Sequence, residues 1–374
     1  MLLMLAACAL PMWWREYRRH GSRATHTTNV GRSTADGRNA RLMGGLVVLV
    51  LMAASVQLQL QLGGAYIGGL PELTFPIMAA LLVWFAWVAW QARRASRGPD
   101  SIASLGDAAL ALLQRRRPNP NAAQCLLGWL VKVFFLPLML AWLYAWLAQI
   151  DRELTSGEGW LSAFVIGMAL LYAMDTLFGT IGYLSTQHIL GAHIRSTDAT
   201  WLGWLSALVC YPPLSLVVLR QWLDYKDGIE WIDWLDDSPI TFAWAVAILL
   251  LTTIYAWATV VFGARFSNLT HRGIITAGPF RWTKHPAYIS KNLSWWLIAV
   301  PFVSQQGAWT AALNCLALLG VNGIYWVRAK TEERHLMHDP VYRQYAQWID
   351  QHGLYARSLR VLGIKRETAS SSST

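Results

Sequence analysis

The residues best suited to chemistry gather between positions 273 and 345. Arg281, Lys284 and His285 stand just before an apolar run. Pro286 follows them and suits the first turn of a helix, because that position needs no N–H donor. Free N–H groups at such a helix start, beside cationic side chains, favour a carboxylate or a phosphate.

Two carboxylates follow the next apolar run. Glu332 lies four positions after Arg328, a spacing that suits one helical face, and Glu333 is its neighbour. If the apolar stretch between the two groups is a membrane hairpin, both groups return to one side. Together they would form a pocket with a positive and a negative pole, which suits a zwitterionic ligand. Taken singly, His285 is better explained as a capping histidine and the glutamates as a solvated charge cluster; inside the ordered set of motifs a binding role is favoured for both.

The composition places this pocket in a membrane protein. Charged residues make up only 14% of the 374 residues, apolar residues make up 55%, and there are 22 Trp. So little charge cannot cover a soluble surface of this size. We therefore predict an all-α, polytopic membrane helix bundle with about eight transmembrane helices.

Six long apolar stretches and a C-terminal hairpin make up this count. The hairpin is predicted to turn at Ser304–Gly307. The expected spans are Leu42–Leu62, Leu73–Trp90, Cys125–Ile150, Trp160–Ile181, Trp201–Trp222, Ile240–Phe262, Leu293–Val303 and Ala308–Val327.

The charges are sorted by this topology. With both termini inside, the inside segments hold 27 Lys and Arg against 10 Asp and Glu, and the outside segments hold three against 10. Basic residues mark the cytoplasmic side, so both termini are predicted to be cytoplasmic. The basic balance then reflects topology, and nucleic-acid binding is not expected.

Two charges lie within the expected spans. Asp175 is predicted either to touch substrate or to pair with Lys132, and Lys132 is otherwise expected to extend to the headgroups. Tyr211-Pro212-Pro213 should kink or interrupt the fifth span. The loop Gln187–Trp201 is either part of a substrate mouth or a plain polar loop.

No metal site is expected, because the histidines show no recognised ligand spacing. The apolar run Met1–Met12 precedes its arginines, which is the wrong order for a signal peptide, so it is interpreted as an interfacial anchor or a start-site artefact.

An ordered set of motifs carries a family resemblance. It comprises Gly278-Pro279-Phe280-Arg281-Trp282-Thr283-Lys284-His285-Pro286-Ala287-Tyr288, then the hairpin, then Arg328-Ala-Lys-Thr-Glu332-Glu333, and finally Tyr342-Arg-Gln-Tyr345. In its C-terminal part the chain resembles the isoprenylcysteine carboxyl methyltransferase family and the related phospholipid methyltransferases. Their pattern has Arg in place of Lys284, Tyr in place of Phe280 and often Gly in place of Ser290.

The resemblance implies S-adenosylmethionine as cofactor and a set of residue roles. Lys284, His285, Pro286, Tyr288, Glu332 and Glu333 would bind the cofactor. Arg328 and Glu333 would be catalytic, and Arg281 and Asp175 are weaker candidates for substrate contact.

The resemblance also suggests a division of the chain. Residues 1–41 would be a basic cytoplasmic arm, 42–262 a six-helix membrane region of unknown role, 263–350 the methyltransferase-like region and 351–374 a cytoplasmic tail.

The favoured function is therefore an integral-membrane, S-adenosylmethionine-dependent methyltransferase with its active site facing the cytosol. Its substrate would be a lipid-like, hydrophobic or lipidated small molecule, with an isoprenylcysteine-type carboxylate as one candidate, and membrane lipids would be partners. The alternatives are an NADPH-dependent membrane sterol-type reductase and a non-catalytic membrane protein or transporter. The oligomeric state is not predicted.

Overall fold

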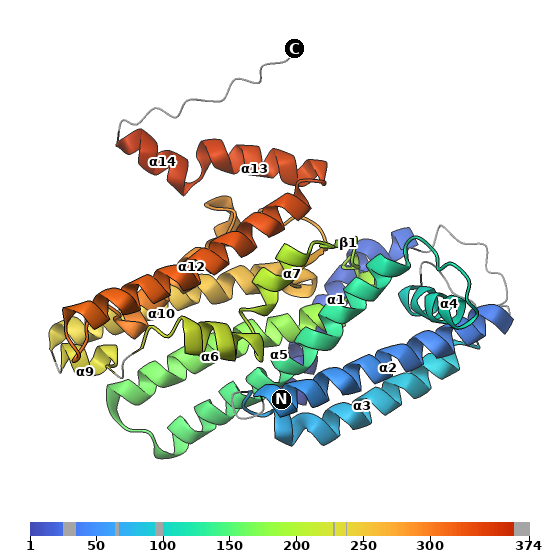
Figure 1. Cartoon of the computed structure of the whole chain (residues 1–374), viewed down its shortest axis with the longest axis horizontal. Coiled ribbons are helices and arrows are strands. Elements are labelled where there is room, and N and C mark those ends of the chain that lie inside the picture. Colours follow the sequence, from blue (N-terminus) through green and yellow to red (C-terminus); the bar gives the residue numbers. More distant parts are fainter. Residues whose placement is uncertain (25–34, 64–66, 94–99, 227–228, 237, 363–374) are drawn as a thin grey trace, which may run out of the picture.

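The structure is a computed structural model that describes residues 1–24, 35–63, 67–93, 100–226, 229–236 and 238–362. It confirms an all-α polytopic bundle (Figure 1). Six described helices are long and apolar enough to cross a membrane. They are α2 (Ala35–Gly63), α3 (Leu70–Gln91), α5 (Ala122–Ser156), α6 (Gly159–Leu184), α10 (Pro239–Phe262) and α12 (Ala308–Leu336).

Shorter elements connect and flank these helices. The helices are α1 (Leu2–Ala24), α4 (Ser101–Leu113), α7 (Trp201–Leu208), α8 (Leu214–Val217), α9 (Trp231–Leu235), α11 (Pro286–Ala299), α13 (Pro340–His352) and α14 (Leu354–Val361). Single 3-10 turns are η1 (His188–Leu190), η3 (Gly263–Arg265) and η4 (Gly278–Arg281), and η2 (Val218–Trp222) is a π-helical turn. Two short strands, β1 (Ser196–Thr197) and β2 (Thr270–His271), pair antiparallel with Ser196 opposite His271.

The helix α5 is the centre of the bundle. More than half of its most apolar stretch is buried, a larger share than in the other five long helices. Its Val131, Phe135 and Leu138 pack with Val56 of α2 and Leu70 of α3. The α3 helix is the opposite case, with only 11% of its most apolar stretch buried, so most of its surface is left to lipid.

Two of the eight predicted spans are not single membrane-length helices in the structure. Trp201–Trp222 is divided into α7, α8 and η2, because Pro212 and Pro213 offer no N–H to an i→i−4 ladder. The helix α11 begins at Pro286 as expected but has only 14 residues, fewer than the about 20 that cross a bilayer. The count of eight and the cytoplasmic placement of the termini stay predictions.

The N-terminal apolar run is the beginning of a packed helix. α1 continues beyond Met12 to Ala24, within the segment predicted as a basic arm. Its Leu5 and Ala9 pack against buried residues of α5 and α6, and Trp13 Nε1 donates to Ser185 Oγ at 2.6 Å. Residues 25–34 of the predicted arm and the tail beyond residue 362 lie outside the described residues.

Asp175 and Lys132 do not pair. Asp175 accepts hydrogen bonds from the hydroxyls of Tyr255 and Thr259, both on α10. Lys132 donates to the Thr186 hydroxyl, and its Nζ lies 4.1 Å from the centroid of the Trp129 ring. Of the alternatives predicted for Asp175, the ion pair with Lys132 is therefore wrong, because each charged group is bonded to neutral hydroxyl groups instead.

One buried guanidinium fastens the basic end of the bundle. Arg272 is 2% exposed and has no ion pair within the described part of the chain. It makes five hydrogen bonds of 2.7–2.8 Å to backbone carbonyl groups. The acceptors are Gly182, Ser185, Ala192, Ala264 and Phe266. Arg272 thus joins the end of α6, the loop after it and the turn after α10, since its planar fork reaches all three.

We expect Arg272→Lys to destabilise the protein by about 2–4 kcal/mol, because an ammonium has three donors and cannot reproduce the fork. The measurement is the midpoint of thermal unfolding in detergent. Arg343→Lys is the matched control, because Arg343 is exposed and has one hydrogen bond, to the Met337 carbonyl. Equal midpoints for the two variants would show that the clamp adds nothing to stability.

Candidate functional site

The imidazole and one of the predicted carboxylates meet where α11 begins and α12 ends. His285 directly precedes Pro286, the first residue of α11, and its Nε2 lies 3.0 Å from Oε1 of Glu333. Lys330 Nζ lies 3.2 Å and Lys284 Nζ 3.9 Å from Oε2 of the same carboxylate. Glu333 is therefore surrounded by three nitrogen groups, although only 13% of its side chain is exposed.

Lys284 also joins the start of the α11–α12 hairpin to helix α13. Its Nζ lies 3.0 Å from Oδ1 of Asp350 on α13. The Tyr345 hydroxyl, on the same helix, donates to the Phe280 carbonyl at 2.7 Å. α13 therefore holds the segment that leads into His285 in place.

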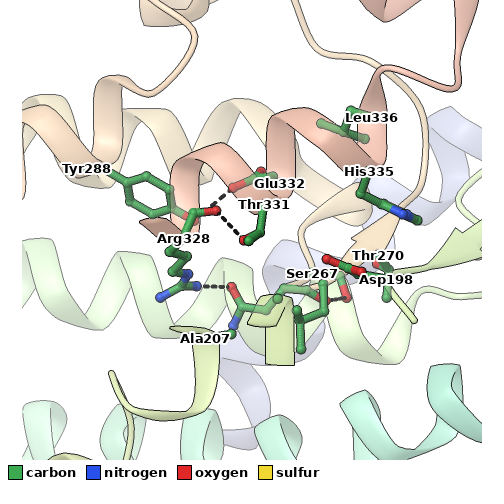
Figure 2. Close-up of a pocket in the computed structure, with 13 residues that line it drawn as sticks. Asp198, Ala207, Ser267, Thr270, Tyr288, Arg328, Thr331, Glu332, His335 and Leu336 are labelled. Atoms are coloured by element: carbon green, nitrogen blue, oxygen red, sulfur yellow. Dashed lines mark hydrogen bonds between the residues drawn. The ribbon is translucent and has the colours of Figure 1, made fainter. Parts of the chain in front are cut away.

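The second carboxylate has a different partner. The Tyr288 hydroxyl donates to Glu332 Oε2 at 2.9 Å, and the rings of Tyr288 and His285 stack with centroids 5.5 Å apart. Figure 2 shows Tyr288 and Glu332 pointing toward one another from α11 and α12. The adjacent acids thus face two different residues of the α11 start.

Arg328 is buried among aromatic rings. The guanidinium carbon lies 5.2 Å from the Tyr288 centroid, 5.5 Å from that of Tyr211 and 5.9 Å from that of Tyr325. Its Nη2 donates to Asn268 Oδ1 at 2.7 Å, and none of the ion pairs among the described residues includes it. The Arg328 and Glu332 side chains line one cavity, as their helical spacing predicts.

This cavity lies between α7, the loop after η3 and α12 (Figure 2). Water-sized molecules have about 40 Å³ of space in it. The polar side chains around it are those of Asp198, Ser267, Asn268, Thr270, Tyr288, Arg328, Thr331, Glu332 and His335. The mixture of acids, a guanidinium and hydroxyls gives the cavity both donors and acceptors.

Several of these lining residues were not anticipated. Asn268 comes from the turn that Arg272 fixes, and Asp198 from the loop predicted as a substrate mouth or a plain polar loop. Asp198 Oδ1 accepts from the Thr200 N–H at 2.8 Å, and His335 Nε2 lies 3.1 Å from Ser196 Oγ. The sequence gives only one indication of these lining residues: each is polar and lies at the end of the bundle where the basic residues gather.

Two predicted site residues lie elsewhere. Arg281 ends η4 with an exposed side chain, and Asp175 is on α6 facing Tyr255. Neither lines the cavity or contacts the cluster of Lys284, His285 and Glu333, which lies beside the cavity without lining it. Pro286 is buried and acts as the first residue of α11, without a polar group to offer. The structure thus brings together Lys284, His285, Tyr288, Arg328, Glu332 and Glu333.

Comparison with known proteins confirms the resemblance. Residues 240–338 match the model of the isoprenylcysteine carboxyl methyltransferase (ICMT) family. This match covers about a quarter of the chain and runs from α10 to the residues just after α12. No curated protein and no solved structure matched the chain. The match supports a membrane methyltransferase and leaves the first four long helices, α2, α3, α5 and α6, without a counterpart.

We expect Asn268→Ala to destabilise the cavity wall by about 1–3 kcal/mol, because it removes a hydrogen bond to a buried guanidinium. Asn268→Asp, which keeps the acceptor and adds a negative charge, should unfold at or above the wild-type temperature. Thermal unfolding in detergent measures both, with Asn121→Ala as control because Asn121 is exposed and makes no side-chain cap. A normal midpoint for Asn268→Ala would contradict the assigned contact.

Proposed function

We propose that this protein is an integral-membrane methyltransferase that uses S-adenosylmethionine and methylates a hydrophobic acceptor at the cytosolic face. The observation that carries the proposal is the meeting of His285 and Glu333 at 3.0 Å within the family-matched region. A shared motif order alone would not require two residues 48 positions apart to touch.

The donor set fits the charges of the cofactor. S-Adenosylmethionine presents an ammonium group, ribose hydroxyls and a carboxylate. Glu332 and Glu333 supply acceptors for the first two, and Lys284, His285 and Arg328 supply positive charge or N–H donors for the third. The cytosolic orientation rests on the excess of basic residues predicted for this side.

The size of the cavity adds a requirement. Its 40 Å³ is far below the ~300–1,000 Å³ of ordinary ligand pockets. Binding therefore requires the side chains over the cavity, chiefly Tyr288 and Arg328, to move apart. The Tyr288–Glu332 hydrogen bond and the Arg328–Asn268 hydrogen bond are the contacts that such an opening would break.

When bound, S-adenosylmethionine supplies an electrophilic methyl group. The protein's contribution is to hold donor and acceptor in line, which positioning residues on two rigid helices are suited to do. The Tyr211, Tyr288 and Tyr325 rings surround Arg328 with apolar surface, which would limit access of water to this part of the site.

We expect His285→Ala and Glu333→Ala each to lower methyl transfer by about 10- to 100-fold or more, since each removes one partner of a charge-assisted hydrogen bond. The measurements are methyl incorporation from labelled S-adenosylmethionine and binding of that cofactor to the purified protein. His338→Ala and Glu158→Ala are matched controls, because both side chains are exposed and belong neither to the cavity nor to the His285–Glu333 cluster.

Two outcomes would contradict the proposal. Wild-type activity in both site variants would reject the site, and binding of NADPH without binding of S-adenosylmethionine would favour the reductase alternative.

A further inference from the structure

A second, larger cavity lies at the same end of the bundle. It has a volume of about 520 Å³ and shares no lining residue with the first. Its walls come from the middle of α1, the end of α6, the loop after α6 and the end of α10. Most of the lining is apolar, including Met12, Phe178, Val260 and Ile275. This volume is within the range of small-molecule sites, and such walls suit a hydrocarbon chain.

The rim of this cavity is positively charged. Arg15 and Arg265 line it, and Arg265 has no ion pair among the residues that the structure describes. Arg15 lies 3.3 Å from Glu16, which also lines the cavity. The Arg265 guanidinium therefore has no carboxylate partner in the part of the chain that the structure describes.

A third arginine stands beside Arg265. A Cβ atom at Gly273 would lie 3.5 Å from Arg265 Nη1 and 3.6 Å from Arg195 Nη2, so these two nitrogen atoms are within about 7 Å of each other. Gly273 has no side chain, so both arginine side chains can approach its backbone. Arg195 has Asp339 at 3.6 Å, which leaves one acid for two neighbouring guanidinium groups.

The nearby histidine does not add to this charge. Burial, with the neighbouring His188 and arginines, lowers the pKa of His193 to about 4. His193 is therefore neutral at ordinary pH. Arg272, also close by, is bonded to carbonyl groups and not to acids. The positive charge that the described residues place at the rim is thus that of arginines, and arginine forks suit phosphate oxygens.

We infer that this cavity binds an anionic phospholipid, with an acyl chain between α1, α6 and α10 and the phosphate group at Arg265 and Arg15. The continuity of an apolar cavity with a basic rim, at the ends of membrane-spanning helices, favours a lipid over a free phosphate. A zwitterionic lipid is disfavoured, because its ammonium group would lie near two guanidinium groups, and the one carboxylate of the lining, that of Glu16, already faces Arg15.

The position of this site connects it to the rest of the fold. Ala192 and Ala264 line the cavity, and their carbonyl groups accept two of the five hydrogen bonds of Arg272. The bound lipid would therefore pack against the backbone that Arg272 fastens. The inference does not depend on methyltransferase activity.

The test is lipid binding to the delipidated, purified full chain, followed by native mass spectrometry. Dioleoyl phosphatidylglycerol and dioleoyl phosphatidylcholine are titrated separately, since they differ in head group only. We expect one tightly bound phosphatidylglycerol, preferred at least about fivefold, the factor that one arginine near a lipid phosphate contributes.

Two variants separate the head group from the chain. Arg265→Gln should bring the two lipids toward equal affinity, whereas Arg152→Gln, at the exposed far end of α5, should leave the preference unchanged. Val260→Trp should weaken both lipids, because it fills the apolar part. Thermal unfolding without lipid checks that each variant is folded.

Three results would overturn the inference. They are equal binding of both lipids to the wild type, an unchanged preference in Arg265→Gln, and displacement of phosphatidylglycerol by millimolar inorganic phosphate. The last would indicate a site for the free anion.

Discussion

The site depends on the positive charge of Arg272, which no carboxylate among the described residues neutralises. Arg272 satisfies its five N–H groups with backbone carbonyl groups from α6, the following loop and the turn after α10. Each of these segments ends a helix or follows one, where carbonyl groups have no partner within the helix. The Arg272 side chain thus supplies hydrogen-bond donors to the carbonyl groups at several helix ends and loops at once. The Asn268 amide is thereby carried to Arg328, and the cavity wall is formed.

The hairpin of α11 and α12 supplies the other half of the site. Because the chain reverses between Ala299 and Ala308, the residues before α11 and those at the end of α12 lie at one level. Glu333 then reaches His285, and Glu332 reaches Tyr288. α13 packs over this junction through Tyr345 and Asp350. The cluster is therefore held on one side by the α11–α12 hairpin and on the other by α13.

The sequence predicted the elements that depend on local spacing. Pro286 marks the start of α11, and the apolar loop-back between the motifs places Glu332 and Glu333 beside Tyr288 and His285. Both follow from helix geometry and from the need to return to one membrane face. Lipid-facing helices such as α3 can also be predicted from the sequence, because their apolar composition matches the lipid that surrounds them.

The contacts between distant segments were not predictable in this way. Arg328 is 60 positions from Asn268, and nothing in either segment indicates the pairing. Asp175 and Lys132 were matched by charge, but hydroxyl groups at closer positions satisfy each of them. Arg281 belongs to the motif, yet the 3-10 turn η4 leaves it at the surface. Hydropathy counted α7, α8 and η2 as one span, but the Tyr211-Pro212-Pro213 sequence correctly indicated that this span would be kinked or interrupted.

The interruption at Pro212 and Pro213 has an angular consequence. In a continuous helix each residue is rotated by about 100° about the axis from the one before. The direction in which side chains project from one half therefore determines the direction in the other half. The break removes this coupling. Ser206 of α7 can thus be oriented toward Thr331, while Leu219 and Leu223 pack toward Leu318 and Val321 of the same α12 helix. Tyr211, at the joint, is free to turn its ring to Arg328. The two halves of this apolar segment can therefore pack independently against α12, the first against its polar end and the second against its apolar middle.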